Sequence, residues 1–262
     1  MSQQHSESNR HTKPIALITG GSRGLGRSMA LQLAQRGVGV ILTYREQADE
    51  AARVVQAIEA EGGAAAALQL DAGEVSSFPA FAQALKGELS RRFQRQRFDY
   101  LVNNAGMGAH ALVVETSEQQ FDALMNVHFK GVFFLTRELL PLLADGGRIL
   151  NISSGLTRFT MPGFGAYAAM KGAVEVLTRY LAKELAPRKI TVNTLAPGAI
   201  ETDFGGGEVR DNPELNRRVA EGTALGRVGL PDDIGKAVAM LLSPDSGWIT
   251  GQRIEASGGQ GL

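Results

Sequence analysis

The chain contains no cysteine and only four histidines, and these shortages exclude several kinds of site. Without cysteine the protein can form no disulfide bond and no thiolate metal site, so its composition suits a reducing compartment. The histidines occupy positions 5, 11, 110 and 128, and no two of them have the helical spacing of a metal-ligand pair. We therefore expect no bound metal.

Two further absences concern charge and long hydrophobic runs. Lys plus Arg and Asp plus Glu number 27 each, so no net charge attracts nucleic acid or an anionic membrane. No apolar run is long enough to cross a bilayer, and residues 1–13 are polar, without the apolar core of a signal peptide. We expect a cytoplasmic protein with a disordered tail at residues 1–13 and with neither nucleic-acid nor membrane partners.

From residue 14 onward, short apolar runs alternate with longer helical patterns. Apolar residues make up 44% of the sequence, as in a soluble protein with a large core. The runs that predict strands are Pro14–Thr19, Val38–Tyr44, Ala65–Leu70, Phe98–Asn103, Arg148–Ser153, Ile190–Leu195 and Trp248–Glu255. The patterns that predict helices are Gly24–Arg36, Gln47–Glu61, residues 76–95, Ser117–Ala144, Gly165–Leu185 and Pro231–Leu242. This alternation predicts an α/β fold: one doubly wound domain over residues 14–262, with helices on both faces of a parallel sheet.

A glycine-rich turn follows the first predicted strand and leads directly into the first helix. Glycines let the backbone turn sharply and let phosphate oxygens approach it, and the amides at the start of the helix attract those oxygens. The position between strand and helix therefore predicts a dinucleotide-binding turn, whereas the alternative is a turn that serves only helix–strand packing. The turn residues expected to contact the cofactor are Gly20, Ser22, Arg23, Gly24, Leu25 and Gly26.

The end of the second predicted strand indicates which dinucleotide binds. An acidic residue there suits the ribose 2′-hydroxyl of NAD, whereas arginine suits the 2′-phosphate of NADP. This chain has Tyr44 and Arg45 at that edge and Arg23 inside the glycine turn, and two guanidiniums match the charge and geometry of a phosphate. Glu46 is the acidic alternative, but it follows the strand end. The pattern favours NADP(H) over NAD.

A tyrosine and a lysine four residues apart form the candidate catalytic pair. Tyr167 and Lys171 lie on one predicted helix, where residues i and i+4 share a face. An ammonium a few ångströms away favours the phenolate by about 2–4 kcal/mol at an effective dielectric near 20, so we expect a lowered tyrosine pKa and an acid/base role. Ser154 follows the fifth predicted strand and can hydrogen-bond a substrate oxygen as charge develops on it. Ser153 is the adjacent alternative.

With these motifs in hand, the chain resembles the short-chain dehydrogenase/reductase family from about Ile15 to Gly259. The motifs that carry the resemblance are the glycine turn, Asn103–Gly106, Ser154, Tyr167 with Lys171, and Pro197–Gly198. The resemblance implies a seven-stranded Rossmann-type sheet, a homotetramer or homodimer, and reversible hydride transfer between a carbonyl and a secondary alcohol. It also implies further cofactor contacts from Asp71, Ala72, Asn103, Ala105, Gly106, Lys171, Pro197, Gly198, Ile200 and Thr202. Asn193 is similar to the structural asparagine of the family.

One position departs from the family pattern. The family usually carries an asparagine that holds a water of a proton relay to the lysine, and His128 takes its place when the Asn-x-Lys-Gly stretch is aligned; Asn126 is two residues away. Histidine can hydrogen-bond a water and titrates near neutrality, so we expect His128 to keep the relay and to add pH sensitivity. The alternative is a histidine with a purely structural hydrogen bond.

The segment at about residues 203–225 contains three consecutive glycines and is predicted to be a lid over the substrate, the alternative being an ordinary surface loop. Arg158 is a possible contact for an anionic substrate. Two rival functions stay open on the sequence alone. One is a non-catalytic NADP-binding regulator, and the other is an isomerase or dehydratase on the same scaffold.

Overall fold

The structure is a computed structural model that describes residues 13–262, and seven parallel strands form its centre. The strand order is β3-β2-β1-β4-β5-β6-β7, and every neighbouring pair is parallel. The strands are β1 Ile15–Ile18, β2 Gly39–Tyr44, β3 Ala65–Gln69, β4 Phe98–Asn103, β5 Leu143–Ile152, β6 Thr191–Pro197 and β7 Arg253–Ala256. The order reverses between β1 and β4, which places a ligand crevice at the carboxyl ends of these strands.

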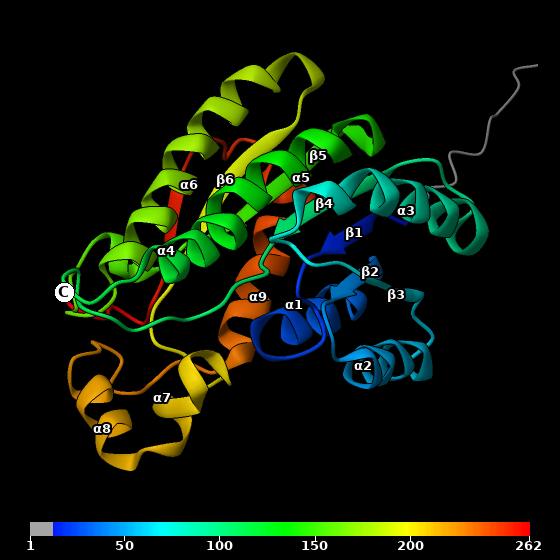
Figure 1. Ribbon diagram of the computed structural model, residues 1–262. Coiled ribbons are helices and arrows are strands. Elements are labelled where there is room, and N and C mark those ends of the chain that lie inside the picture. Colours follow the sequence, from blue (N-terminus) through cyan, green and yellow to red (C-terminus); the bar gives the residue numbers. More distant parts are fainter. Residues whose placement is uncertain (1–12) are drawn as a thin grey trace, which may run out of the picture.

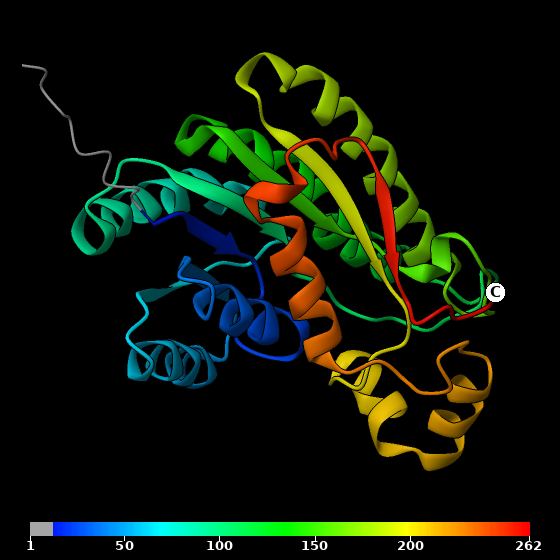
Figure 2. The same cartoon turned by 180° about the vertical axis from the view of Figure 1, so that it is seen from behind.

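Helices cover both faces of the sheet, as Figures 1 and 2 show from opposite sides. One face carries α1 Gly24–Ala34, α2 Ala48–Ala60 and α9 Pro231–Leu241. The other carries α3 Phe78–Phe93, α5 Gly131–Leu139 and α6 Gly165–Glu184, with α4 Glu118–Met125 packed against α6. Two short helices, α7 Glu208–Asp211 and α8 Pro213–Glu221, project as a lobe beside the carboxyl ends of the strands. The predicted doubly wound α/β architecture is confirmed.

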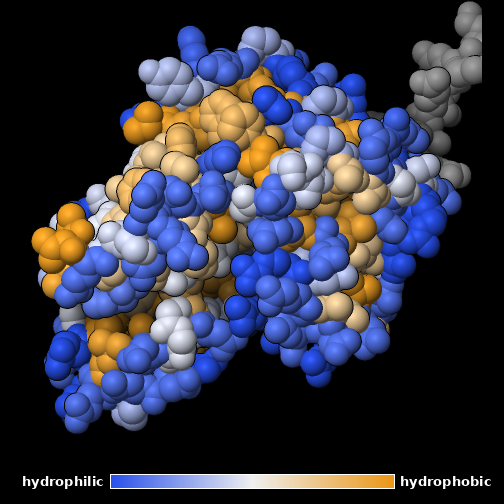
Figure 3. Space-filling model, in the orientation of Figure 1, coloured by the Kyte–Doolittle hydropathy of each residue, from blue (hydrophilic) through white to orange (hydrophobic). Residues whose placement is uncertain are grey.

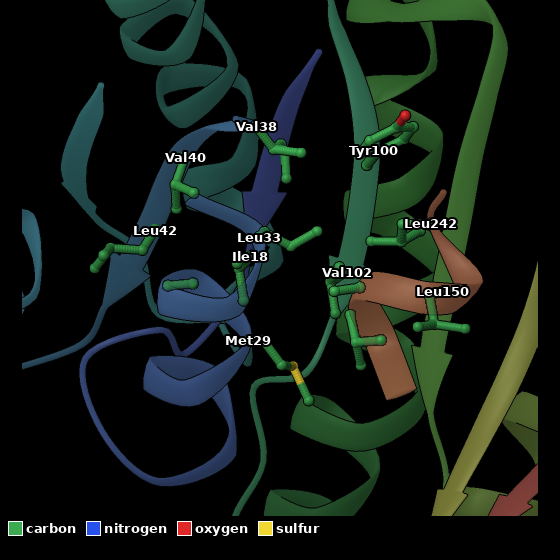
Figure 4. Packing of buried hydrophobic residues seen from close by; sticks show 14 of the residues in the cluster. Ile18, Met29, Leu33, Val38, Val40, Leu42, Tyr100, Val102, Leu150 and Leu242 are labelled. Carbon is green, nitrogen blue, oxygen red and sulfur yellow. The ribbon is translucent and has the colours of Figure 1, made fainter. Parts of the chain in front are cut away.

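Alternate strand residues supply the two hydrophobic cores. In β1, Ala16 and Ile18 pack toward α1 and α9, whereas Ile15 and Leu17 pack toward α3 and α5. Figure 4 shows the first core, in which Met29 of α1 lies between the strands and the helices. Each such side chain that is fully buried contributes about 1.5–3 kcal/mol, so the sheet is a rigid platform for the loops at its carboxyl edge.

Several predicted elements have different bounds: β5, for example, begins at Leu143 rather than at Arg148. The long helical stretch expected over Ser117–Ala144 is helical from Glu118 to Leu142, but it is not uniform: α4 ends at Met125, a π-helical turn covers Asn126–Lys130, α5 ends at Leu139, and a short 3₁₀ turn leads into β5 at Leu143. Pro141 ends the helical hydrogen bonding there because it has no N–H to donate.

The last strand is also shorter than the predicted Trp248–Glu255. It covers only Arg253–Ala256, because Gly251 has φ +71, a left-handed conformation that interrupts extended backbone. Asn193 joins β6 to the segment that precedes β7, since its Nδ2 donates to the Ile249 carbonyl at 2.7 Å and its Oδ1 accepts from the Gln252 amide at 3.0 Å. This is a structural role, as the resemblance implied.

The segment predicted as a lid folds into the projecting lobe. Its three glycines, residues 205–207, all adopt left-handed φ values of 63, 80 and 82, which other residues rarely tolerate in succession. Figure 3 shows a hollow between this lobe and the body of the molecule, with hydrophobic residues near it. No helix within residues 13–262 is long and apolar enough to cross a membrane. The tail predicted at residues 1–13 falls outside the described residues except for Lys13.

Candidate active site

The glycine turn lies at the end of β1, against the end of β2. Its amides bind β2 directly: Gly21 N donates to the Thr43 carbonyl at 2.8 Å and Gly20 N to Thr43 Oγ1 at 3.2 Å. Helix α1 then begins without a side-chain cap from Arg23 and without an acidic residue in its first turn. The first amides of the helix, with the positive end of its dipole, therefore face the crevice and suit an anionic group.

A second strand end braces this turn. Asn104 Nδ2 donates to the carbonyls of Thr19 and Gly20 at 2.9 and 3.1 Å, and Thr19 Oγ1 accepts from the amides of Asn104 and Ala105 at 2.9 Å each. Asn103 is different. Its side chain points into the core and donates to Thr136 and Asn151, so only its backbone can line a cofactor channel. Sequence reasoning did not predict these hydrogen bonds, although Thr19 ends the first predicted strand and Asn104 lies within the Asn103–Gly106 motif.

The residues expected to choose between the dinucleotides lie at the same corner. Arg23 is exposed, and Arg45 is exposed with its guanidinium 3.0 Å from Glu46. Because Thr43 binds the glycine turn, Tyr44 and Arg45 follow directly beside it. Glu46, the acidic alternative, is occupied by its ion pair with Arg45. Arg23 and Arg45 are thus exposed cationic residues of the turn and of the adjoining strand end.

The other predicted cofactor contacts lie around the crevice. Thr202 is buried against the turn, because a Cβ at Gly24 would lie 3.6 Å from Thr202 Cβ. Asp71 follows β3 and its Oδ1 accepts from the Gly73 amide at 2.8 Å, with Ala72 between them. A cavity of about 410 Å³ adjoins the start of α1. It is lined by Gly24, Arg27, Ser28, Leu31, Glu201, Thr202, Asp203, Arg210, Leu230, Pro231 and Asp232.

The loop after β6 holds the remaining predicted contacts. Pro197 ends β6, and Gly198 donates its amide to the Ala256 carbonyl at 3.2 Å. The next amide, of Ala199, donates to Gln260 Oε1 at 2.8 Å, and Ile200 forms a bridge with Gly229. This loop is therefore held by residues from the C-terminal part of the chain.

The catalytic candidates meet where β5 and α6 face each other. Tyr167 and Lys171 are buried on α6, and Lys171 Nζ donates to the Ile152 carbonyl at 2.8 Å. The same Nζ lies 5.7 Å from the centre of the Tyr167 ring. Ser154 hydrogen-bonds the Tyr167 hydroxyl, whereas Ser153 donates to Glu175 instead. The geometry thus selects Ser154 over its neighbour.

Burial dominates the ionisation of this pair. It raises the pKa of Tyr167 to about 12, although the hydrogen bond from Ser154 opposes the rise, and it lowers the pKa of Lys171 to about 8. The expectation of a lowered tyrosine pKa is therefore wrong for this structure, because desolvation is the largest influence and outweighs the hydrogen bond from Ser154. At neutral pH Tyr167 is protonated and can donate a proton.

His128 lies in the π-helical turn and is 1% exposed. Its Nε2 is 2.7 Å from the Met107 carbonyl, which can only accept, so Nε2 carries the proton and Nδ1 is a buried acceptor with no hydrogen-bond partner among residues 13–262. Burial and the nearby Lys171 lower the pKa of His128 to about 3. The predicted pH sensitivity is therefore wrong, since the ring is neutral near pH 7. The ring stands edge-on to Tyr167, with centres 5.1 Å apart.

Tyr167 belongs to a small apolar cluster with Leu124 and Met170, against which Met107 and Phe164 pack. Phe204, directly before the three glycines, has its ring centre 5.7 Å from that of Tyr167. Phe164 packs edge-on against His110 at 5.2 Å. The possible contact of Arg158 with an anionic substrate is not supported, because its Nε and Nη2 donate to Glu255 at 2.8 and 2.7 Å and its Nη1 donates to the Gly261 carbonyl at 3.1 Å. The wall of the site is thus mainly apolar.

Comparison with known proteins identifies the family. A family model described as Enoyl-(Acyl carrier protein) reductase matches residues 20–260. The chain belongs to the short-chain dehydrogenase/reductase family. It is similar to hydroxynaphthalene reductase arp2 of Aspergillus fumigatus, with 35% identity over 91% of this chain and 89% of that protein.

Solved structures of this family superpose on nearly the whole chain. One is LugOII, described as a promiscuous reductase that catalyses keto-reduction at C1 during lugdunomycin biosynthesis, with 39% identity, a TM-score of 0.91, and 96% and 99% of the two chains covered. Another is the angucycline C-6 ketoreductase LanV with bound NADP, with 37% identity, a TM-score of 0.90, and 95% and 96% covered. This short-chain dehydrogenase/reductase is therefore an oxidoreductase.

Proposed function

We propose that the chain is an NADP(H)-dependent ketoreductase that converts a carbonyl group on an aromatic compound into a secondary alcohol. The observation that carries the proposal is the buried, protonated Tyr167, bonded to Ser154 and one helical turn from Lys171. The NADP bound to LanV and the reductase names of the relatives support the same reaction. When bound, NADPH supplies the hydride.

Several residues around the crevice suit the chemical groups of NADP(H). The uncapped start of α1 receives the pyrophosphate, and Arg23 and Arg45 hold the 2′-phosphate, for which a guanidinium is better suited than a carboxylate. Thr202 closes the opposite side of the turn. Lys171 completes the site on the nicotinamide side.

Tyr167 donates the proton. As negative charge develops on the carbonyl oxygen, the phenol transfers its proton there, and Ser154 stabilises the phenolate that remains by donating a hydrogen bond to it. A phenol with a pKa raised to about 12 is fully protonated at neutral pH, whereas its phenolate is scarce. Tyr167 therefore rests in the form that has a proton to donate during carbonyl reduction.

His128 and Lys171 return a proton to Tyr167. Lys171 has a pKa near 8, so it exchanges protons readily at neutral pH. The Nδ1 of His128 accepts a hydrogen bond from a water of this relay, as the asparagine of the family does. Conversion of His128 to Ala should lower turnover, whereas His128→Asn should restore most of it. Equal rates in His128→Ala and wild type would remove His128 from the relay.

The substrate is a flat aromatic ketone. Phe204 offers a ring at the open side of Tyr167, and aromatic rings pair at centre distances of about 4.5–7 Å. The names of relatives support an aromatic substrate, since one is a hydroxynaphthalene reductase and another an angucycline ketoreductase. The segment at residues 203–225 acts as the lid that carries this ring. A homotetramer or homodimer and a cytoplasmic location stay predictions.

The test follows the absorbance of reduced nicotinamide with a panel of bicyclic aromatic ketones, aliphatic ketones and an enoyl thioester. We expect stoichiometric NADPH consumption with the bicyclic ketones and a loss of at least about 10²-fold in Tyr167→Phe. Consumption with the enoyl thioester alone would overturn the ketoreductase assignment. Binding without turnover would indicate a regulator, and product without net cofactor change an isomerase.

A further inference from the structure

The Glu175 carboxylate accepts hydrogen bonds from the loop that carries Ser154. Glu175 lies on α6, one turn beyond Lys171, and its side chain is 14% exposed. One oxygen, Oε1, accepts from Ser153 Oγ at 2.6 Å, from Thr157 Oγ1 at 2.8 Å and from Arg253 Nε at 2.9 Å. Two of these donors flank Ser154 in the sequence. The carboxylate therefore fixes the serine loop to the helix that bears the tyrosine.

Arg253, on the edge strand β7, holds the same loop from the other side. Its Nη2 donates to the Ser154 carbonyl at 3.3 Å and to Thr157 Oγ1 at 3.2 Å, while its Nη1 donates to Glu255 at 2.9 Å. The backbone of Ser154 and the side chains on both sides of it are thus bonded to one ion pair. The Ser154 hydroxyl oxygen accepts from the Leu156 amide at 3.2 Å, and its own proton stays available for the hydrogen bond to Tyr167.

We infer that Glu175, acting with Arg253, is a positioning residue that holds Ser154 at the Tyr167 hydroxyl. Hydrogen bonds to a carboxylate are short and strong, and this pair is only partly exposed, so salt screens it less than a surface pair. A displacement of about 1 Å at a reacting group can cost about 10²-fold in rate. The kinetic test of this inference rests on the proposed ketoreductase function, whereas the spectroscopic test does not.

The first measurement is kinetic and uses the full chain. Glu175→Ala should lower kcat for the bicyclic ketone by roughly 10- to 100-fold, with the NADPH dissociation constant changed by less than about twofold. Glu175→Gln keeps an acceptor oxygen and should recover most of that loss. Glu184→Ala, at the exposed end of the same helix, is the control and should behave like wild type.

A double-mutant cycle separates positioning from general damage. In a Ser154→Ala background, Glu175→Ala should cause almost no further loss, because the residue that it positions is gone. Full additivity of the two losses would overturn the inference, and so would a fall in NADPH affinity that accounts for the whole effect.

The second measurement needs no activity. With 3-fluorotyrosine incorporated, the ¹⁹F resonance of Tyr167, assigned from its absence in Tyr167→Phe, reports the hydrogen bond from Ser154. Glu175→Ala should shift this resonance in the same direction as Ser154→Ala, and Glu184→Ala should not shift it. An unmoved resonance in Glu175→Ala contradicts the inference. If the wild type reduces no ketone, the proposed function fails while this measurement still decides the role of Glu175.

Discussion

Substitution of Gly26 by alanine should weaken both the fold and the cofactor site, for a reason visible in the turn itself. A Cβ at this position would lie 2.1 Å from the Gly20 carbonyl oxygen and 2.7 Å from Asn104 Nδ2. Real Cβ contacts are never this short, so the turn must move away from α1. The Gly20 carbonyl and Asn104 Nδ2 must both move, and these two groups form a hydrogen bond of 3.1 Å.

The expected magnitude combines two losses. Overpacking of this kind costs about 1–3 kcal/mol, and the weakened hydrogen bond adds about 0.5–1.5 kcal/mol. A total of about 1.5–4.5 kcal/mol corresponds to a fall of roughly 3–18 °C in the melting temperature of a domain of this size. The NADPH dissociation constant should rise as well, because the displaced amides no longer meet the pyrophosphate.

Gly87→Ala is the matched control for this substitution. Gly87 lies on the exposed surface of α3, and a Cβ there would meet nothing within 4 Å. Alanine should stabilise that helix by about 0.5–1 kcal/mol. Thermal melting and NADPH titration by fluorescence check both variants. If Gly26→Ala melted with or above Gly87→Ala and bound NADPH normally, the steric reasoning would be refuted.

Three further predictions concern the site. The double variant Arg23→Ala, Arg45→Ala should lose at least about tenfold in affinity for NADPH and little for NADH, measured by titration, with exposed Arg36→Ala as the control; equal losses would contradict the assignment. The rate of ketone reduction should fall as pH rises through about 8, because burial lowers the pKa of Lys171 to about 8 and the charged form is lost above it; a flat kcat profile from about pH 7 to 9 would count against this role. Phe204→Ala should raise KM for bicyclic ketones by about 2- to 10-fold and leave small aliphatic ketones unaffected, since only a flat ring stacks on Phe204.

Much of this molecule follows from local patterns in the sequence. The alternation of apolar runs and helical patterns predicts the doubly wound sheet, because strands buried on both faces must be apolar throughout. The i, i+4 spacing predicts that Tyr167 and Lys171 share one face of α6, as they do. The position of the glycine turn after β1 does not by itself predict its hydrogen bonds to Thr43. Those bonds follow from the parallel pairing of β1 with β2, which brings the ends of both strands to the same edge of the sheet.

The failures share a cause, since each depends on what the fold places around a residue. The ionisation of Tyr167 and His128 is decided by burial, which pairwise spacing cannot supply. The π-helical turn at His128 reflects the close approach of α5 to the loop after β3, where a Cβ at Gly131 would lie 1.9 Å from the Ala72 carbonyl oxygen. The grip of Glu175 on the serine loop joins residues 78 positions apart in the chain through Arg253.

Burial also sets the resting protonation state of the catalytic pair. Removing Tyr167 from water disfavours its phenolate, and the same burial disfavours the ammonium of Lys171, although an amine with a pKa near 8 still carries its proton at pH 7. The neutral phenol has a proton to give, but its raised pKa makes it a weaker acid, so the phenolate that remains must be stabilised. Ser154 is the group that stabilises the phenolate, and Glu175 and Arg253 hold the loop of Ser154. The precision of that loop therefore determines how much of the cost of the developing phenolate is offset, which makes the ion pair on β7 and α6 part of the catalytic design.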